Sequence, residues 1–183
     1  MGKLIFILGG ARSGKSTYAQ ELAKSVERER GGGVAFIATA EAGDEEMRAR
    51  IEKHRRDRPP SWDTVEAPMK VAAAVAEASA GRAAVVVDCL TLLISNLLLA
   101  EGEEANREET TQRVLREVEE LIEATQATKA DVIVVSNEVG MGIVPSTRLG
   151  RLFRDIAGQA HQLLARAADE MYFILAGLPQ KLK

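Results

Sequence analysis

The sequence contains very little cysteine, since Cys89 is the only one among 183 residues. One thiol cannot form a disulfide within the chain, and it cannot supply a zinc site built from several thiolates. The chain is therefore expected to fold without covalent cross-links in a reducing compartment, the cytoplasm. Cys89 itself is interpreted as a small buried residue.

The chain also lacks an excess of positive charge, because 24 Lys and Arg stand against 27 Asp and Glu, for a net charge of -3. Proteins that wrap nucleic acid need a basic face, so no nucleic-acid partner is expected. The apolar run 4–8 is too short for a signal-peptide core or a membrane span. Gly2 is a poor myristoylation site, because Phe6 stands where that pattern requires Ser or Thr. We expect no membrane insertion.

What the chain does contain is the composition of a globular protein, with 46% hydrophobic and 28% charged residues. This length fits a single domain, residues 1–183. Short, nearly continuous apolar runs alternate with longer helical stretches, which is typical of an α/β fold with a mostly parallel sheet and helices on both faces. The predicted strands cover residues 3–8, 34–38, 83–88, 131–136 and 170–176.

Two of the helical stretches are especially clear. A helix over 16–29 should stop at the three glycines 31–33. A later helix is expected to be amphipathic, with charged residues around an apolar stripe. This stripe consists of Val114, Leu115, Val118, Leu121 and Ile122. The acidic stretch 101–109 is interpreted as a solvated loop that leads into a helix start, in preference to a metal site.

The strongest motif spans residues 9–16 and matches G-x-x-x-x-G-K-[ST], the P-loop or Walker A pattern, between a predicted strand and a predicted helix. Its glycines let backbone N–H groups turn inward, and the helix N-terminus adds positive potential for phosphate oxygens. Lys15 is expected to reach the β- and γ-phosphates, while Ser16 would bind Mg²⁺. The motif residues are Gly9, Gly10, Ala11, Arg12, Ser13, Gly14, Lys15 and Ser16. The fold prediction is therefore P-loop NTPase-like.

A magnesium-dependent P-loop enzyme also needs an acid at the end of a nearby strand, and Asp88 ends the run Val85-Val86-Val87-Asp88. We favour this metal role for Asp88. The alternative is a helix N-cap, and the two roles are compatible, because an apolar helical segment follows.

His54 lies in the last turn of a helix predicted over 44–56, before Arg58-Pro59, which must end the helix. The neighbouring basic residues Lys53, Arg55, Arg56 and Arg58 attract phosphate and favour an uncharged imidazole. A neutral imidazole can act as a nucleophile. Composition alone, however, favours an ordinary surface histidine.

Nearly the whole chain resembles the family of bifunctional adenosylcobinamide kinases / adenosylcobinamide-phosphate guanylyltransferases. The resemblance rests on GGARSGKS from Gly9, on DEEMRARIEKHRRDRPPSW over 44–62, and on the segment 136–170 that begins SNEVGMGIVPSTRLGRLFRD. It implies that ATP or GTP phosphorylates adenosylcobinamide, and that GTP then donates GMP to the resulting phosphate. It also implies a GMP-histidine intermediate on His54 and a homotrimer.

By the same resemblance, further residues should border the guanine nucleotide. They are Ala38, Thr39, Ala40, Arg55, Arg56, Asp57, Arg58 and Glu66. A carboxylate at Glu66 can accept hydrogen bonds from guanine N1–H and its exocyclic amine, although a solvated strand-end glutamate is nearly as good an interpretation. Arg12 either braces transferring phosphates or faces outward.

Other classes of protein stay open at this stage. The main alternative is a monofunctional P-loop small-molecule kinase, in which His54 is only a surface residue. Two other classes are more remote. A nucleotide-gated switch is disfavoured because the sequence shows no obvious interaction tail or repeat, and a corrinoid-binding module would not need Lys15 and Ser16.

Three further segments carry weaker predictions. Residues 137–142 follow a buried strand and could contact phosphate or corrinoid, or serve backbone geometry with 143–145 at a subunit contact. His161 is interpreted as a packed helix residue without a catalytic role. Pro179 predicts that the C-terminal segment is an edge strand or irregular, because proline cannot donate to a ladder.

Overall fold

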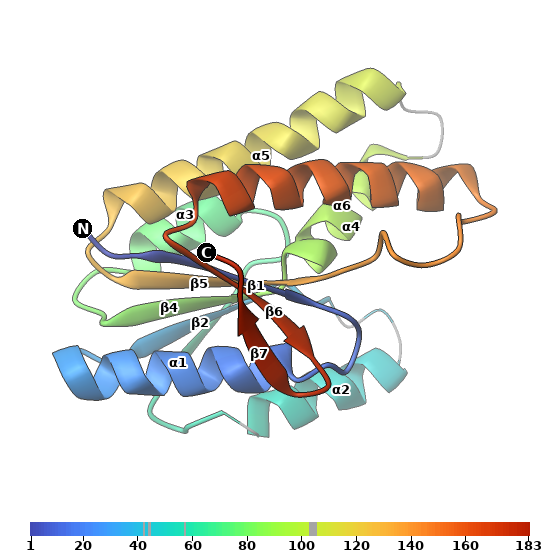
Figure 1. The fold of residues 1–183 in the computed structure, drawn as a ribbon. Coiled ribbons are helices and arrows are strands. Elements are labelled where there is room, and N and C mark those ends of the chain that lie inside the picture. The colour runs from blue at the N-terminus through green and yellow to red at the C-terminus, as the bar shows by residue number, and fades with distance from the viewer. Residues whose placement is uncertain (42, 44, 57, 103–105) are drawn as a thin grey trace.

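The computed structural model describes residues 1–41, 43, 45–56, 58–102 and 106–183. Within them, one sheet separates two layers of helices, as Figure 1 shows. The α/β prediction, with helices on both faces of the sheet, is confirmed.

The sheet of the described residues has seven strands in the order β3-β2-β4-β5-β1-β6-β7. All neighbouring strands pair in parallel except β6 and β7, which form an antiparallel hairpin. The strands are β1 (Leu4–Gly9), β2 (Val34–Ala38), β3 (Asp63–Glu66), β4 (Ala84–Asp88), β5 (Asp131–Asn137), β6 (Glu170–Leu175) and β7 (Leu178–Lys181).

The helices divide unequally between the two faces. On one face lie α1 (Lys15–Arg30) and α2 (Glu45–Arg56), below the sheet in Figure 1. The other face is covered by α3 (Val71–Ala78), α4 (Leu90–Glu101), α5 (Arg107–Ala127) and α6 (Arg148–Ala167). Each face of the sheet packs its own apolar core against these helices. Burial on both sides explains why β1, β2 and β4 have almost no polar residues.

Parallel pairing brings the carboxyl ends of distant strands to one edge of the sheet. β5 lies between β4 and β1, so Asn137 pairs with Gly9, and Asp88 pairs with Val135. On the other side of β4, Ala38 of β2 pairs with both Asp88 and Glu66. Ligands of open α/β sheets bind at such an edge.

The five predicted strands, the helix over 16–29 and the amphipathic helix that carries the apolar stripe from Val114 to Ile122 are all present, with boundaries within a residue or two for the strands and the first helix. The predicted helix 44–56 is observed from Glu45, and Asp44 lies outside the described residues. The C-terminal segment forms β7 at the edge of the sheet, as Pro179 required. Of the stretch 101–109, residues 103–105 lie outside the described part, and Asn106 caps α5.

No group of three or more His, Cys, Asp or Glu side chains that could hold a metal occurs among the described residues. Across the same residues, no helix is both long enough and apolar enough to cross a membrane.

Cys89 is buried as predicted, and burial raises the pKa of its thiol to about 11.

Candidate active site

The glycine-rich loop after β1 leads directly into α1. Gly14 stands at the helix N-cap with φ 99°, a left-handed conformation that favours glycine. A Cβ at Gly9 would lie 2.6 Å from the carbonyl oxygen of Ile174, so only glycine fits there. Lys15 Nζ donates to the carbonyl oxygen of Gly10 at 2.5 Å, across the loop. The first turn of α1 has no acidic residue, so its N-terminus keeps its attraction for an anion.

Ser16, in the first turn of α1, and Asp88, at the end of β4, come together. Ser16 Oγ donates to Asp88 Oδ2 at 2.7 Å, although β5 lies between β4 and β1, the strand that leads into the glycine-rich loop. The N-cap residue of α4 is Cys89, and no side chain caps that helix. The Asp88 carboxylate therefore faces the glycine-rich loop, and its alternative role as helix N-cap is not observed.

His54 shares a pocket with the first turns of α1. The pocket has a volume of about 300 Å³ and is lined by Ser16, Thr17, Gln20, Glu21, Lys24 and His54. The imidazole is half-buried there, in the last turn of α2. A potential nucleophile thus lies beside the helix that begins at the phosphate-binding motif.

The basic residues around His54 have different surroundings. Arg55 Nη2 donates to Glu66 Oε1 at 3.0 Å, in an exposed ion pair. Arg58 stacks over the ring of Phe36, with its guanidinium carbon 3.6 Å from the ring centroid. Burial lowers the pKa of Arg58, and the negative charge of nearby Asp88 opposes this shift. Arg56 is exposed, and Asp57 lies outside the described residues.

The segment 38–40 lies at the same sheet edge, but its threonine faces the protein interior. Thr39 is fully buried. Its hydroxyl donates to the carbonyl oxygen of Cys89 at 2.8 Å and accepts from the Cys89 N–H at 2.7 Å. These bonds tie the end of β2 to the end of β4. A nucleotide contact through this segment stays a prediction, as does the role of the exposed Arg12, whose φ is 56°.

Comparisons with known proteins give this arrangement its context. A family model described as cobinamide kinase / cobinamide phosphate guanyltransferase matches residues 5–182. The chain belongs to this family. It is accordingly an enzyme, a cobinamide kinase and cobinamide phosphate guanyltransferase, and the resemblance drawn from the motifs is confirmed.

Individual relatives match over almost their full length. Bifunctional adenosylcobalamin biosynthesis protein CobP of Pseudomonas aeruginosa is 46% identical over 178 residues, covering 97% of this chain and 95% of that protein. Bifunctional adenosylcobalamin biosynthesis protein CobU of Salmonella typhimurium is 40% identical over 185 residues, covering 98% of this chain and 99% of that one. The protein of the same name from Escherichia coli K12 matches to the same extent. Because these relatives are named as bifunctional biosynthesis proteins and match almost the whole chain, the comparisons do not support a nucleotide-gated switch or a corrinoid-binding module.

The end of β5 and the segment that follows it in this cobinamide kinase are held by hydrogen bonds to α4 and within the segment itself. The side chain of Asn137 donates to Thr91 Oγ1 at 3.1 Å. The Glu138 carboxylate accepts from the N–H groups of Gly140 and Met141 at 2.7 and 3.0 Å. Backbone geometry is therefore one role of this segment. A contact with phosphate or corrinoid stays a prediction.

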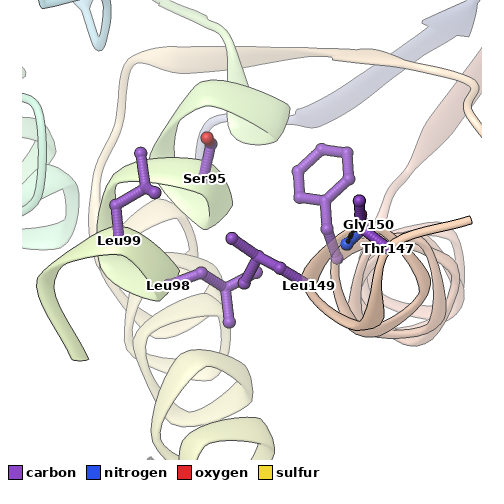
Figure 2. Close-up of a pocket in the computed structure, with 7 residues that line it drawn as sticks. Ser95, Leu98, Leu99, Thr147, Leu149 and Gly150 are labelled. Atoms are coloured by element: carbon purple, nitrogen blue, oxygen red, sulfur yellow. Dashed lines mark hydrogen bonds between the residues drawn. The ribbon is translucent and has the colours of Figure 1, made fainter. Parts of the chain in front are cut away.

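A second pocket lies beyond this segment, between α4 and the start of α6. Its volume is also about 300 Å³, and Figure 2 shows Leu98 of α4 facing Leu149 of α6, with Leu99 farther from α6. The lining is mainly apolar, and three neighbouring apolar side chains in the preceding loop are exposed: Met141, Ile143 and Val144. Such exposed apolar groups are typical of an interaction surface.

Sequence reasoning did not single out four residues of the His54 pocket: Thr17, Gln20, Glu21 and Lys24. They carry a helical signal, since Ser16, Gln20 and Lys24 recur every four residues on one face of α1. That spacing shows which residues share a face. It does not show that α2 places His54 against it.

Proposed function

We propose that this enzyme phosphorylates adenosylcobinamide with ATP or GTP, and then transfers GMP from GTP to adenosylcobinamide phosphate. The product is adenosylcobinamide-GDP, an intermediate in the assembly of the cobalamin nucleotide loop. We further propose that one nucleotide site serves both reactions. The observation that supports a shared site is that His54 and Ser16 line the same pocket.

In the kinase step, the substrate hydroxyl oxygen attacks the γ-phosphorus, and the bond to the β-phosphate oxygen breaks. Positioning and charge stabilisation supply most of the catalysis in such transfers. The loop N–H groups of residues 9–14 and the ammonium of Lys15 would hold the phosphates, with Arg12 beside them. The helix N-terminus of α1 adds positive potential at the same place.

The oxygen atoms of Ser16 and Asp88 fit Mg²⁺, which prefers hard oxygen ligands and usually keeps one or two protein ligands besides water and substrate phosphates. Their contact at 2.7 Å puts a hydroxyl and a carboxylate side by side at the end of the loop. When bound, the metal would neutralise charge on the phosphates. Ser16 and Asp88 are therefore our proposed metal ligands.

In the guanylyl step, an imidazole nitrogen of His54 attacks the α-phosphorus of GTP and pyrophosphate leaves. A phosphate oxygen of adenosylcobinamide phosphate then attacks the same phosphorus, and the bond to the imidazole breaks. The intermediate divides a difficult transfer between two anions into two displacements. Two in-line displacements give net retention of configuration at phosphorus.

Recognition of the base is proposed for the edge formed by the ends of β2 and β3. Glu66 lies there, with its carboxylate paired to Arg55 of the helix that carries His54. This pairing places the proposed guanine acceptor and the proposed nucleophile on neighbouring segments. The other proposed nucleotide contacts are Ala38, Thr39, Ala40, Arg56, Asp57 and Arg58.

The experiment that tests this function compares wild type with His54→Ala. With GTP labelled at the α-phosphate, wild type should retain acid-labile, alkali-stable label, as a phosphoramidate requires. His54→Ala should lose this label and GMP transfer, while at least part of the kinase activity remains. Glu52→Ala is the matched control, because Glu52 is exposed on the same helix and does not line the pocket.

Each result separates the candidate functions. Equal GMP transfer by His54→Ala and wild type would refute the assigned nucleophile. A wild-type protein that phosphorylates cobinamide but never retains GMP would be a monofunctional kinase. Loss of both activities in His54→Ala and in the control would trace the defect to the fold of α2.

We also propose a homotrimer and a cytoplasmic location. The trimer is supported by the exposed apolar side chains of the loop between β5 and α6, of which Ile143 is 96% exposed. The location is supported by the single cysteine, which needs no oxidising compartment.

A further inference from the structure

The hairpin of β6 and β7 ends in a tight turn formed by Ala176 and Gly177. Both residues have positive φ, 50° and 83°, as in the type I′ turns that join two strands through two residues. Alanine pays a steric cost in this conformation. Both residues are exposed, so burial in the core does not explain why Ala176 adopts this conformation.

The turn contacts the glycine-rich loop directly. The N–H of Gly177 donates to the carbonyl oxygen of Ser13 at 2.8 Å. A Cβ at Gly14 would lie 3.2 Å from the Cα of Gly177, so the two backbones pack closely. Just below, Ile174 pairs with Gly9 in the sheet. The hairpin therefore follows the phosphate-binding loop from its first glycine to its last.

The peptide unit that accepts this bond is also the one that carries the Gly14 N–H. In a planar trans peptide, the carbonyl of Ser13 and the N–H of Gly14 point in opposite directions. With the carbonyl held toward the hairpin, the N–H is turned to the side that the hairpin leaves open. Loop N–H groups turned this way are the donors of an anion nest.

We propose that Gly177 is a positioning residue, which holds the Ser13–Gly14 peptide so that the Gly14 N–H donates to a nucleotide phosphate. The inference rests on the proposed nucleotide site. It adds a residue far along the chain to the loop's own motif, and assigns the C-terminal hairpin a part in both reactions.

The base of the hairpin is anchored to the same strand and helix. Glu170 of β6 accepts from Lys3 Nζ at 2.7 Å, from Lys181 Nζ at 3.0 Å and from the hydroxyl of Tyr172 at 2.6 Å. Tyr172 packs edge-on against Tyr18 of α1, with ring centroids 5.2 Å apart. These contacts fix the hairpin relative to the strand, loop and helix that together bind phosphate.

The test replaces Gly177 by Ala and by Val and measures KM for GTP in both reactions. A β-branched residue resists positive φ more than alanine does, so Val should displace the turn further. We expect Gly177→Val to raise both KM values about tenfold, the effect of weakening one hydrogen bond to a charged group. Gly177→Ala should raise them less, and kcat should change less than KM in both variants.

The matched control is Gly81→Val. Gly81 also has positive φ, 70°, and a Cβ there meets nothing within 4 Å, as at Gly177. It precedes the first residue of β4, whereas Gly177 follows the last residue of β6, so the two glycines lie at opposite ends of the parallel strands. We expect a comparable loss in melting temperature with an unchanged KM. If Gly177→Val has the wild-type KM at a comparable melting temperature, the inference is wrong.

Two further measurements separate a failure of the proposed nucleotide site from a failure of the role proposed for Gly177. Lys15→Ala should abolish tight GTP binding; if it binds GTP normally, the proposed nucleotide site fails, whatever Gly177 does. Should the Gly177 variants not fold, amide hydrogen exchange of wild type decides. The Gly177 N–H should exchange slowly and more slowly still with pyrophosphate bound, and exchange at the rate of a free peptide would overturn the inference.

Discussion

The two histidines of the chain have opposite surroundings. His161 is 9% exposed, bonds to Ser136 Oγ through Nε2 at 2.8 Å, and packs against the ring of Phe6. Burial lowers its pKa to about 4. His54 instead lines a polar pocket on the surface. The prediction that His161 is a packed helix residue is thus confirmed, and His54 is the histidine open to a ligand.

The buried His161 predicts how stability depends on pH. Its pKa is lower in the folded state than the ordinary 6.5, so the unfolded chain takes up its proton first as pH falls. The stability present above pH 6.5 is therefore lost progressively toward pH 4. Between pH 7 and pH 5 this should cost about 2 kcal/mol.

Urea unfolding at the two pH values measures this loss. His161→Gln keeps a polar partner for Ser136 but cannot be protonated, so its stability should fall less over the same range. If wild type and His161→Gln lose equal stability between pH 7 and pH 5, some other group causes the pH dependence.

At the scale of an element, α4 links the sheet edge that carries Asp88 to the second pocket. It begins directly after Asp88 and Cys89, and its buried side includes Leu93, which is 1% exposed. Leu99, near its other end, is 64% exposed and lines the second pocket. The helix is apolar on almost every side, a pattern that needs cover all round. The rest of the chain covers only part of the surface of α4, since Leu99 stays exposed.

The two leucines of α4 predict contrasting effects of the same substitution. Leu93→Ala should lower the free energy of unfolding by about 3 kcal/mol, because it leaves a cavity against the sheet. Leu99→Ala should change the stability of the isolated chain by less than about 0.5 kcal/mol. Denaturant unfolding at a concentration too low for association gives both values. Equal losses would show that Leu99 is covered in the isolated chain.

At the scale of the whole molecule, the proposed trimer leads to a further prediction. Ile143→Lys should shift the protein from trimer to monomer in sedimentation equilibrium, because burying an unpaired charge in an apolar contact is strongly unfavourable in free energy. Glu119→Lys serves as the control, since Glu119 is an exposed residue of α5. A wild-type protein that sediments as a monomer at micromolar concentration would exclude the trimer.

The sequence by itself determined the elements that depend on local signals. Continuous apolar runs marked the buried strands, and the spacing of glycines, Lys15 and Ser16 marked the loop between β1 and α1. It gave no range for β3, although one interpretation of Glu66 is a strand-end residue, because the four residues of β3 are only half-buried or exposed and are too few for a periodic pattern. Nor did it mark α3, an alanine-rich helix of eight residues.

Only the tertiary structure decided which distant residues meet. The fold brings Ser16 of α1 to Asp88 of β4, α2 places His54 in one pocket with Glu21 and Lys24, and the hairpin places Gly177 on Ser13. The physical reason is that propensity and periodicity act over a few residues along the chain. Contacts between segments that are distant along the chain follow from how whole strands and helices bury their apolar faces together.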